Sequence, residues 1–366
     1  MRVGIVSYWF NRGQAVVSRR IRAALDAAGF ETCVLARPTK GSFVRSGFID
    51  RSGPWAQRGI TAASRYEIPE VEYLEWAADN MLDLVLCDQN LQFRELAALR
   101  RRGVRTVGRF VWEAFGPGDV AGAVEAFDTI YSVTRCEQQR YVGFGIESPL
   151  VRWAPPPELA AIGRPRRTDG EVRFFYPGGY LSDRKPTAET IAAFCQVRDP
   201  RARLILKAQD PLRGPKLAAE AERADPRIRV ITADLPDDEH HRLMASCDVL
   251  LAPTRWEGLG LHHGEAIALG LPAITNDFPP MNENVTHRID GWLVPAEWQT
   301  ERVPGVPRLE TPVEPLTAAI EALCDDDLRA RLAEGVARRR AAVTWADTAR
   351  DLVGLVTGGL AARAAA

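Results

Sequence analysis

The chain has 366 residues, more than one ordinary core accommodates, because domains usually run to about 100–200 residues. Its hydrophobic fraction of 46% and charged fraction of 26% are typical of a folded globular protein and exclude a disordered one. A formal net charge of -1 argues against a nucleic-acid binder, which usually carries a clear basic excess. We therefore expect two domains and no nucleic-acid partner.

The termini and the cysteines bound the cellular context. No stretch reaches the roughly 20 apolar residues that a transmembrane helix needs. The N-terminus begins directly with an apolar, strand-like run and lacks the features of a signal peptide. The cysteines lie far apart and form no CxxC pair, so we expect no zinc site. These features predict a cytoplasmic protein without a transmembrane segment.

The first half of the chain alternates strand-like and helix-like segments. Residues 2–10 are apolar, a polar turn follows, and apolar residues then recur at helical spacing up to Gly29. The next strand covers residues 31–36, which gives a βαβ unit whose crossover should be right-handed. After an irregular stretch the alternation resumes, with strands expected at 82–87, 105–111, 129–133 and 149–153 and helices at 121–127 and 136–142.

The second half repeats this pattern after three prolines at 155–157 and a polar stretch, where regular structure should stop. Strands are expected at 173–176, 203–206, 228–231, 249–251 and 273–275, with helices between them. Two alternating halves indicate an α/β protein with two Rossmann-like, doubly wound domains facing a cleft. The expected boundaries are 1–156, a linker at 157–170, 171–340, and a helical tail at 341–366 whose return to the first domain is open.

The most informative run covers residues 254–274. A strand ends near Pro253, a Gly-rich loop follows, and the next helix is stopped by Gly270 with Pro272 behind it. The loop therefore lies at the carboxyl end of a parallel strand, where open α/β sheets bind ligands. Gly258 and Gly260 permit close approach of the backbone, and the N–H groups at the helix start suit a diphosphate.

Two carboxylates flank this loop. Glu265 lies within about two helical turns of the helix start and can accept hydrogen bonds from ribose hydroxyls, and Glu257 lies in the loop itself. The spacing alone leaves a second interpretation open, in which this is an ordinary βα loop whose glutamate stabilises the helix dipole.

The full pattern is more specific than the spacing. Glu257-x7-Glu265, continued by Ala-Ile-Ala-Leu-Gly-Leu-Pro, resembles the signature of the retaining glycosyltransferase family 4, of the "glycosyl transferases group 1" type. The resemblance extends to residues 172–185, 280–283 and 290–294 and to Trp345, so it covers the C-terminal half. The N-terminal half matches only in architecture and in its first βα turn.

The resemblance implies a GT-B fold and a metal-independent glycosyltransferase that needs no cofactor. Such an enzyme moves a sugar from a nucleotide diphosphate sugar to an acceptor hydroxyl and retains the anomeric configuration. The second domain would bind the donor, and the first would bind a small-molecule, glycan or glycolipid acceptor.

The resemblance also implies roles for individual residues. Glu265 would hold the donor ribose, and Glu257 would contact the transferred sugar near its reacting face. Sugar and diphosphate would be held by the backbone of Gly258, Leu259, Gly260 and Leu261.

A second loop, residues 179–185, falls where the family has a Gly-Arg…Lys segment. Lys185 matches the lysine and would act catalytically as a cation for the leaving diphosphate. Tyr180 stands where the family has arginine, which is a departure, and Arg184 is the candidate for the second positive charge. Without the resemblance, Arg184 and Lys185 would be interpreted as a solvated helix start.

In the first half, Gly13 resembles the glycine turn that faces the donor phosphates, although a simple turn glycine fits the sequence equally well. Many family members carry a histidine after a strand of this domain, but none of the histidines here lies in the first half. Glu113 is our candidate for the catalytic position, with a surface acid as the alternative. We expect no metal site at His262 and His263, because adjacent helical residues diverge by about 100°.

Two other functions stay open at this point. The first is another enzyme on the same scaffold, such as a nucleotide-sugar epimerase or a phosphorylase. The second is a non-catalytic nucleotide-sugar-binding protein, which the missing histidine and Tyr180 favour. Both glutamates and Lys185 argue against it.

Overall fold

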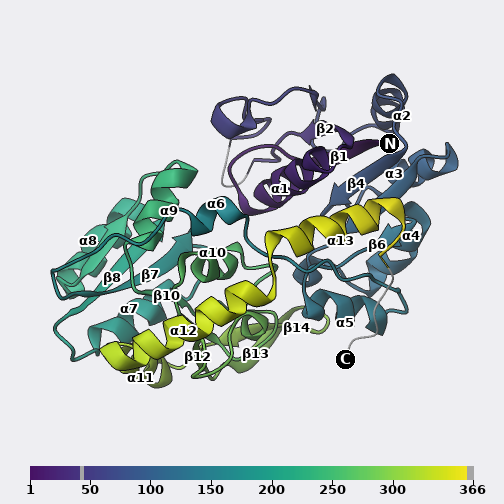
Figure 1. The fold of residues 1–366 in the computed structure, drawn as a ribbon. Coiled ribbons are helices and arrows are strands. Elements are labelled where there is room, and N and C mark those ends of the chain that lie inside the picture. The colour runs from purple at the N-terminus through teal and green to yellow at the C-terminus, as the bar shows by residue number, and fades with distance from the viewer. Residues whose placement is uncertain (42–44, 361–366) are drawn as a thin grey trace. The chain divides into compact units, whose positions relative to one another are not determined.

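The computed structural model describes residues 1–41 and 45–360, and their side chains except those of residues 302 and 303. The chain folds into two compact units (Figure 1). The first unit comprises Met1–Trp153 together with Ala346–Ala366, and the second comprises Ala154–Trp345. Residues 157–170, where we expected a linker, lie within the second unit.

The first unit is built on a six-stranded sheet in the order β3-β2-β1-β4-β5-β6. All its neighbouring strands are parallel. β4 is buried along its whole length, because helices cover both faces of such a sheet. The strands are β1 (Arg2–Tyr8), β2 (Glu31–Arg37), β3 (Ile60–Ala62), β4 (Leu84–Asp88), β5 (Arg105–Arg109) and β6 (Thr129–Ile130).

Helices connect these strands, and two of them, over residues 70–79 and 93–101, were not predicted. They are α1 (Gly13–Ala27), α2 (Glu70–Asp79), α3 (Phe93–Arg101), α4 (Val120–Ala126) and α5 (Arg135–Gly143), with short 3-10 turns η1 (Gly53–Trp55), η2 (Trp112–Ala114) and η3 (Pro117–Asp119).

The C-terminal helix α13 (Trp345–Thr357) completes the first unit and is drawn in yellow in Figure 1. Arg152 Nε lies 2.8 Å from Oδ2 of Asp351, which is on this helix. Arg105 Nη1 donates to the backbone oxygen of Val356 at 2.8 Å. The end of the chain is therefore tied to the unit in which the chain begins.

The second unit repeats the plan, with a six-stranded sheet in the order β12-β11-β10-β7-β8-β9. Its neighbouring strands are again parallel. The strands are β7 (Val172–Gly179), β8 (Ala202–Ala208), β9 (Ile228–Ile231), β10 (Val249–Ala252), β11 (Ala273–Asn276) and β12 (Gly291–Val294). The helices are α6 (Pro157–Ala160), α7 (Thr187–Cys195), α8 (Gly214–Ala224), α9 (Asp237–Ala245), α10 (Leu261–Leu269), α11 (Val313–Ala322) and α12 (Asp326–Ala342), with the 3-10 turn η4 (Met281–Asn284).

Both sheets reverse their strand order once. In the first unit the reversal falls between β1 and β4, and in the second it falls between β7 and β10. Ligands of doubly wound sheets bind outside the carboxyl ends of the strands at this switch point. The two units therefore present two equivalent places for a ligand, one each.

Three further local features differ from the expected elements. Residues 149–153 form no strand, since only Leu150 makes a bridge, to Ser132, beside the two-residue strand β6. The proline run does not exclude helix, because a proline fits the first turn of α6, where no N–H is needed. An antiparallel hairpin of β13 (Glu297–Val303) and β14 (Val306–Glu310) was not predicted.

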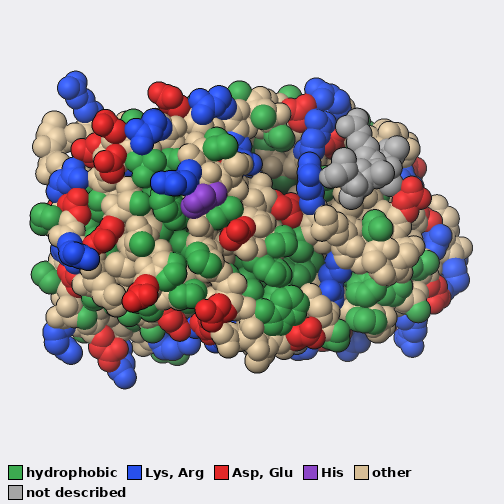
Figure 2. All heavy atoms as spheres, turned by 90° about the horizontal axis from the view of Figure 1, so that it is seen from below, with side chains coloured by type: hydrophobic (Ala, Val, Ile, Leu, Met, Phe, Trp, Pro, Cys, Tyr) green, Lys and Arg blue, Asp and Glu red, His purple; other side chains and the backbone are tan. Residues whose placement is uncertain are grey.

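The surface carries both signs of charge. On the face drawn in Figure 2, basic and acidic side chains are interspersed rather than gathered in one basic patch. Within the described residues, none of the helices combines the length and the apolar character needed to cross a membrane.

Candidate functional site

The Gly-rich loop and α10 lie as the sequence indicated, directly after β10 at the switch point of the second sheet. Gly260 caps α10 with φ +68°, a conformation that residues with a side chain rarely adopt. A Cβ atom at Gly260 would lie 2.8 Å from Nδ1 of His263 and 3.2 Å from Cγ of Glu257. Only glycine therefore allows the helix to begin here with its N–H groups at the carboxyl edge of the sheet.

A charged cluster lies beside this helix start. The loop after β7 brings Lys185 to Glu257, with Nζ 3.1 Å from Oε2, and Arg184 Nη1 lies 3.1 Å from Oε1 of the same carboxylate. The Lys185 and Glu257 side chains are each 6% exposed, whereas that of Arg184 is 39% exposed. The structure thus joins three of the predicted site residues from the two loops that follow β7 and β10.

Burial and neighbouring charge set the ionisation of this cluster. Burial lowers the pKa of Lys185 to about 8, although the charge of Glu257 acts in the opposite direction. Burial also disfavours the charged form of Glu257, but Arg184 and Lys185 overcome this effect and hold its pKa below the ordinary value. Near neutral pH the site therefore contains one carboxylate and two cations.

Arg255 fixes the two loops against each other, a role that sequence reasoning missed. Its backbone N–H donates to the backbone oxygen of Arg184 at 2.9 Å, and its Nη1 donates to that of Asp183 at 2.7 Å. Its guanidinium also reaches Glu189 at 2.6 Å and Glu310 at 3.2 Å. The loop that carries the cations is therefore held in place, and the unpredicted hairpin supplies one of its anchors.

Glu265 lies on α10 and is 8% exposed. Its Oε1 is 3.4 Å from Nε2 of His241, which α9 contributes. His241 was not predicted as a site residue. The sequence does not indicate this contact, because His241 lies on α9 and Glu265 on α10, and the strand β10 separates these two helices along the chain.

The two adjacent histidines of α10 do not diverge as expected, because their ring centroids lie 4.4 Å apart, but they have different partners. His263 is 1% exposed, and its Nε2 is 3.1 Å from the hydroxyl oxygen of Thr275. His262 Nε2 lies 3.8 Å from Oε2 of Glu257. Burial lowers the pKa of both rings, that of His263 to about 4, so both are neutral near pH 7.

The candidates of the first unit lie at the carboxyl edge of its own sheet. Gly13 begins α1 directly after the loop that follows β1, and it is exposed. Glu113 lies in η2, after β5, and is 9% exposed. The structure therefore buries Glu113, in contrast to the surface acid considered as an alternative.

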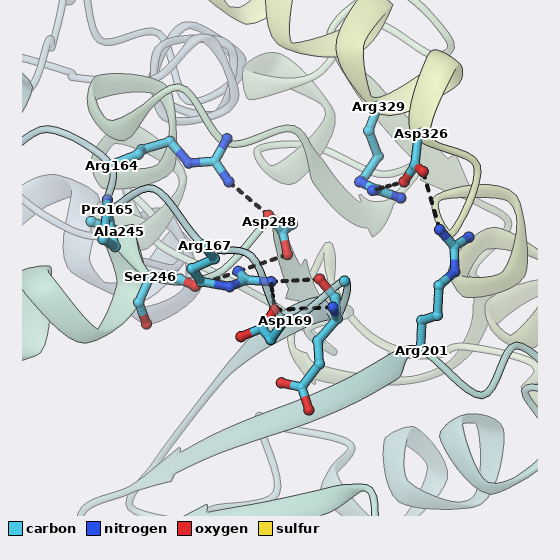
Figure 3. Close-up of a pocket in the computed structure, with 12 residues that line it drawn as sticks. Arg164, Pro165, Arg167, Asp169, Arg201, Ala245, Ser246, Asp248, Asp326 and Arg329 are labelled. Atoms are coloured by element: carbon cyan, nitrogen blue, oxygen red, sulfur yellow. Dashed lines mark hydrogen bonds and ion pairs between the residues drawn. The ribbon is translucent and has the colours of Figure 1, made fainter.

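No described group of three or more His, Cys, Asp or Glu side chains is arranged to hold a metal ion. A cavity of about 350 Å³ opens at the opposite, amino edge of the second sheet (Figure 3). Its arginines are ion-paired: Arg164 lies 2.9 Å and Arg167 3.0 Å from Asp248, and Arg201 lies 3.1 Å from Asp326, which also pairs with Arg329. This cluster neutralises itself and stabilises the strand ends.

Solved structures share the whole fold. Sucrose-phosphate synthase from Thermosynechococcus elongatus superposes with a TM-score of 0.74 at 17% identity, covering 98% of each chain. HepE from Anabaena, in complex with UDP-glucose, gives a TM-score of 0.73 at 14% identity, covering 98% of this chain and all of HepE. WaaG, a glycosyltransferase of lipopolysaccharide biosynthesis, gives 0.66 at 15% identity, with 98% of this chain and 100% of WaaG covered. The likeness confirms the GT-B class, with two Rossmann-like domains.

A family match adds to this likeness of fold. Residues 171–304 match the family model described as Glycosyl transferases group 1. The match includes the loop of residues 179–185, the Gly-rich loop and α10, which carry much of the resemblance, but it does not reach Trp345. Curated proteins give no significant match to the sequence.

Proposed function

We propose that this protein transfers a glycosyl group from a nucleotide diphosphate sugar to an acceptor hydroxyl, with retention of anomeric configuration. One observation carries the proposal above all: Lys185, Arg184 and Glu257 meet beside the start of α10, at the switch point of a family-matched domain. Cations and a helix N-terminus together suit the diphosphate of a donor.

The chemistry follows from the charges. The bond between the anomeric carbon and the phosphate oxygen breaks, and negative charge grows on the leaving diphosphate. Lys185 and Arg184 would stabilise that charge. Cations that are already in position stabilise the charge that develops in a transition state, and this is usually a large contribution to catalysis. The acceptor oxygen forms the new bond to the anomeric carbon, and its proton passes to a phosphate oxygen or to a protein carboxylate.

Glu257 would keep the two cations in place and contact the transferred sugar. Attack from the face that the diphosphate leaves preserves the anomeric configuration, as the family resemblance implies. We assign the donor to the second unit and the acceptor to the first. UDP-glucose is the first donor to test, since HepE binds it on the same fold.

The proposal is tested by incubating the protein with a panel of nucleotide sugars and a panel of acceptors. We expect a glycoside product whose anomeric configuration, read by nuclear magnetic resonance, matches that of the donor. A product of opposite configuration would contradict retention. Turnover of the donor without any acceptor would instead favour an epimerase or phosphorylase.

Glu265→Gln should weaken donor binding by roughly 1.5–3 kcal/mol, the free energy of a hydrogen bond to a charged group. The change keeps the shape of the side chain and removes the charge that ribose hydroxyls would contact. Calorimetric titration with UDP-glucose measures the effect, and Glu239→Gln, an exposed acid of α9, is the matched control. Unchanged affinity in the Glu265 variant would remove it from the ribose role.

Transfer should continue in the presence of EDTA. Lys185 and Arg184 already bring two positive charges to the place where the diphosphate would lie, so charge neutralisation does not depend on a divalent ion. A comparison of initial transfer rates with and without the chelator tests whether a divalent ion is needed. Loss of activity with EDTA and its recovery with manganese would contradict a metal-independent mechanism.

A further inference from the structure

A second cavity, of about 260 Å³, lies in the first unit, and none of the candidate site residues described above lines it. It is lined by Arg37, Tyr66, Glu67, Gln89, Leu91 and Gln92. Arg37 is the last residue of β2, and Gln89 follows β4 directly. Because β1 lies between those two strands, the cavity is at the carboxyl edge beside the switch point of the first sheet.

Arg37 is the unusual member of this lining. The residue is only 6% exposed, yet no described acidic side chain forms an ion pair with it. Its Nε donates to the backbone oxygen of Tyr66 at 2.7 Å, its Nη2 lies 3.4 Å from Oε1 of Gln92, and its Cζ lies 3.9 Å from the centroid of the Tyr66 ring. A guanidinium has five N–H donors, so most of them donate to no described residue.

A buried charge without a partner is costly, and buried charges in proteins are therefore paired. The other cavity of this protein shows the usual solution, since each of its arginines has a carboxylate within ion-pair distance (Figure 3). Arg37 lacks that compensation within the described residues. Its missing partner is best supplied by an anionic ligand.

The remaining lining is suited to holding such a ligand. Gln89 adopts φ +52°, a strained backbone conformation of the kind found at functional sites, and its Oε1 accepts from the backbone N–H of Val111 at 2.7 Å. At the rim, Glu67 lies 3.5 Å from Lys40, so its charge is balanced there. The exposed Leu91 adds an apolar wall.

We propose that this cavity is an acceptor subsite that recognises a sugar bearing a carboxylate or phosphate group. Arg37 would bind the acidic group through two parallel N–H donors, the geometry in which guanidinium recognises both anions. The Gln89 amide would contact a hydroxyl of the same sugar. The assignment of this ligand as an acceptor rests on the proposed function, whereas its charge is inferred from Arg37 alone.

The test compares pairs of sugars that differ in one acidic group. Methyl glucuronide against methyl glucoside isolates a carboxylate, and glucose 6-phosphate against glucose isolates a phosphate. Calorimetric titration of the full chain should show that at least one acidic member binds roughly 10–100-fold more tightly than its neutral partner. Equal affinities in both pairs would overturn the proposal.

Two variants test whether the preference for acidic sugars arises in this cavity. Arg37→Gln should abolish the charge preference, and its survival in a folded Arg37 variant would overturn the proposal. Because Arg37 is buried, Leu91 offers a second route: it is 44% exposed, so substitution there should not disturb the core. Leu91→Asp adds a carboxylate to the cavity lining that includes Arg37 and should lower acidic-sugar affinity about tenfold or more, whereas the equally sized Leu91→Asn should not.

The same samples separate this proposal from the function on which it rests. UDP-glucose titration reports the donor site of the second unit independently of any acceptor. Failure of every donor in the panel to bind would contradict the glycosyltransferase function and leave the charge preference standing. Donor binding without any charge preference would contradict the acidic acceptor alone.

Discussion

Replacing Lys185 with alanine should lower kcat for glycosyl transfer by roughly 10²–10³-fold, because it removes a preorganised charge from the leaving diphosphate. The ammonium is buried and lies 3.1 Å from Glu257, so it is held in one position before the reaction begins. Rates at saturating donor measure the loss. Lys216→Ala, which removes an exposed lysine from the same unit, is the control and should keep the full rate.

The pH dependence gives this prediction a second readout. Burial lowers the pKa of Lys185 from 10.5 to about 8, so the free protein loses this positive charge as the pH rises through 8. kcat/KM for the donor, which reports on the free enzyme, should fall on that alkaline side. The Lys185→Ala variant should lack this alkaline decrease in kcat/KM.

The free energy of unfolding should rise with pH, whereas kcat/KM falls. A lysine whose pKa is lowered in the folded state opposes folding while it is protonated, and this penalty disappears between about pH 8 and pH 10.5. The wild-type protein should therefore gain stability over that range relative to the alanine variant, as thermal denaturation can show. A folded variant with full rate and an unchanged pH profile would make Lys185 a structural cation.

The sequence carried most of the information about the fold. Strands that are buried on both faces read as apolar runs, and glycines at the ends of α10 mark its bounds, so β10, α10 and β11 are found within a few residues. The alternation of strands and helices then leaves little choice of topology. The order of the strands within each sheet was not predicted from these signals and comes from the structure.

Local signals do not report distant partners, and the unpredicted features share this property. The hairpin β13–β14 is anchored through Arg255 and Glu310, which lie far apart in the sequence. His241 comes beside Glu265 only because α9 and α10 flank the same sheet. Arg37 reads as an ordinary strand-end arginine until its burial is known.

The burial of Glu113 is another property that the sequence did not predict. Its position after an expected strand was visible in the sequence, but its exposure was not, and a catalytic acid and a surface acid were equally compatible with the pattern. The structure buries it at the carboxyl edge of the first sheet. Its role stays a prediction, and it can be tested directly.

The surroundings of Glu113 are built to hold a loop in place. β5 ends at Arg109, which is 2% exposed and bonded to Glu137 at 2.6 Å and to Asp88 at 3.0 Å. After η2, the backbone oxygen of Phe115 accepts from Arg140 Nε at 2.7 Å. The chain is therefore anchored on both sides of Glu113.

Glu113→Gln should consequently reduce turnover by about 10²–10⁴-fold, the usual contribution of a general base, if the carboxylate orients and deprotonates the acceptor hydroxyl. Glutamine keeps the size of the side chain and its capacity to accept a hydrogen bond, but it cannot take up the proton. Donor affinity should stay nearly constant, because the proposed donor contacts belong to the second unit. Turnover and UDP-glucose titration on the same preparation measure the two quantities.

A purely structural role for this buried acid makes a different prediction. The variant would then lose thermal stability together with activity, or it would lose neither. Glu125→Gln, which changes an exposed acid of the neighbouring helix α4, is the matched control for a general effect of charge. Near-normal turnover of a stable Glu113→Gln protein would leave the acceptor proton to the donor phosphate, whose oxygen departs on the face from which the acceptor attacks.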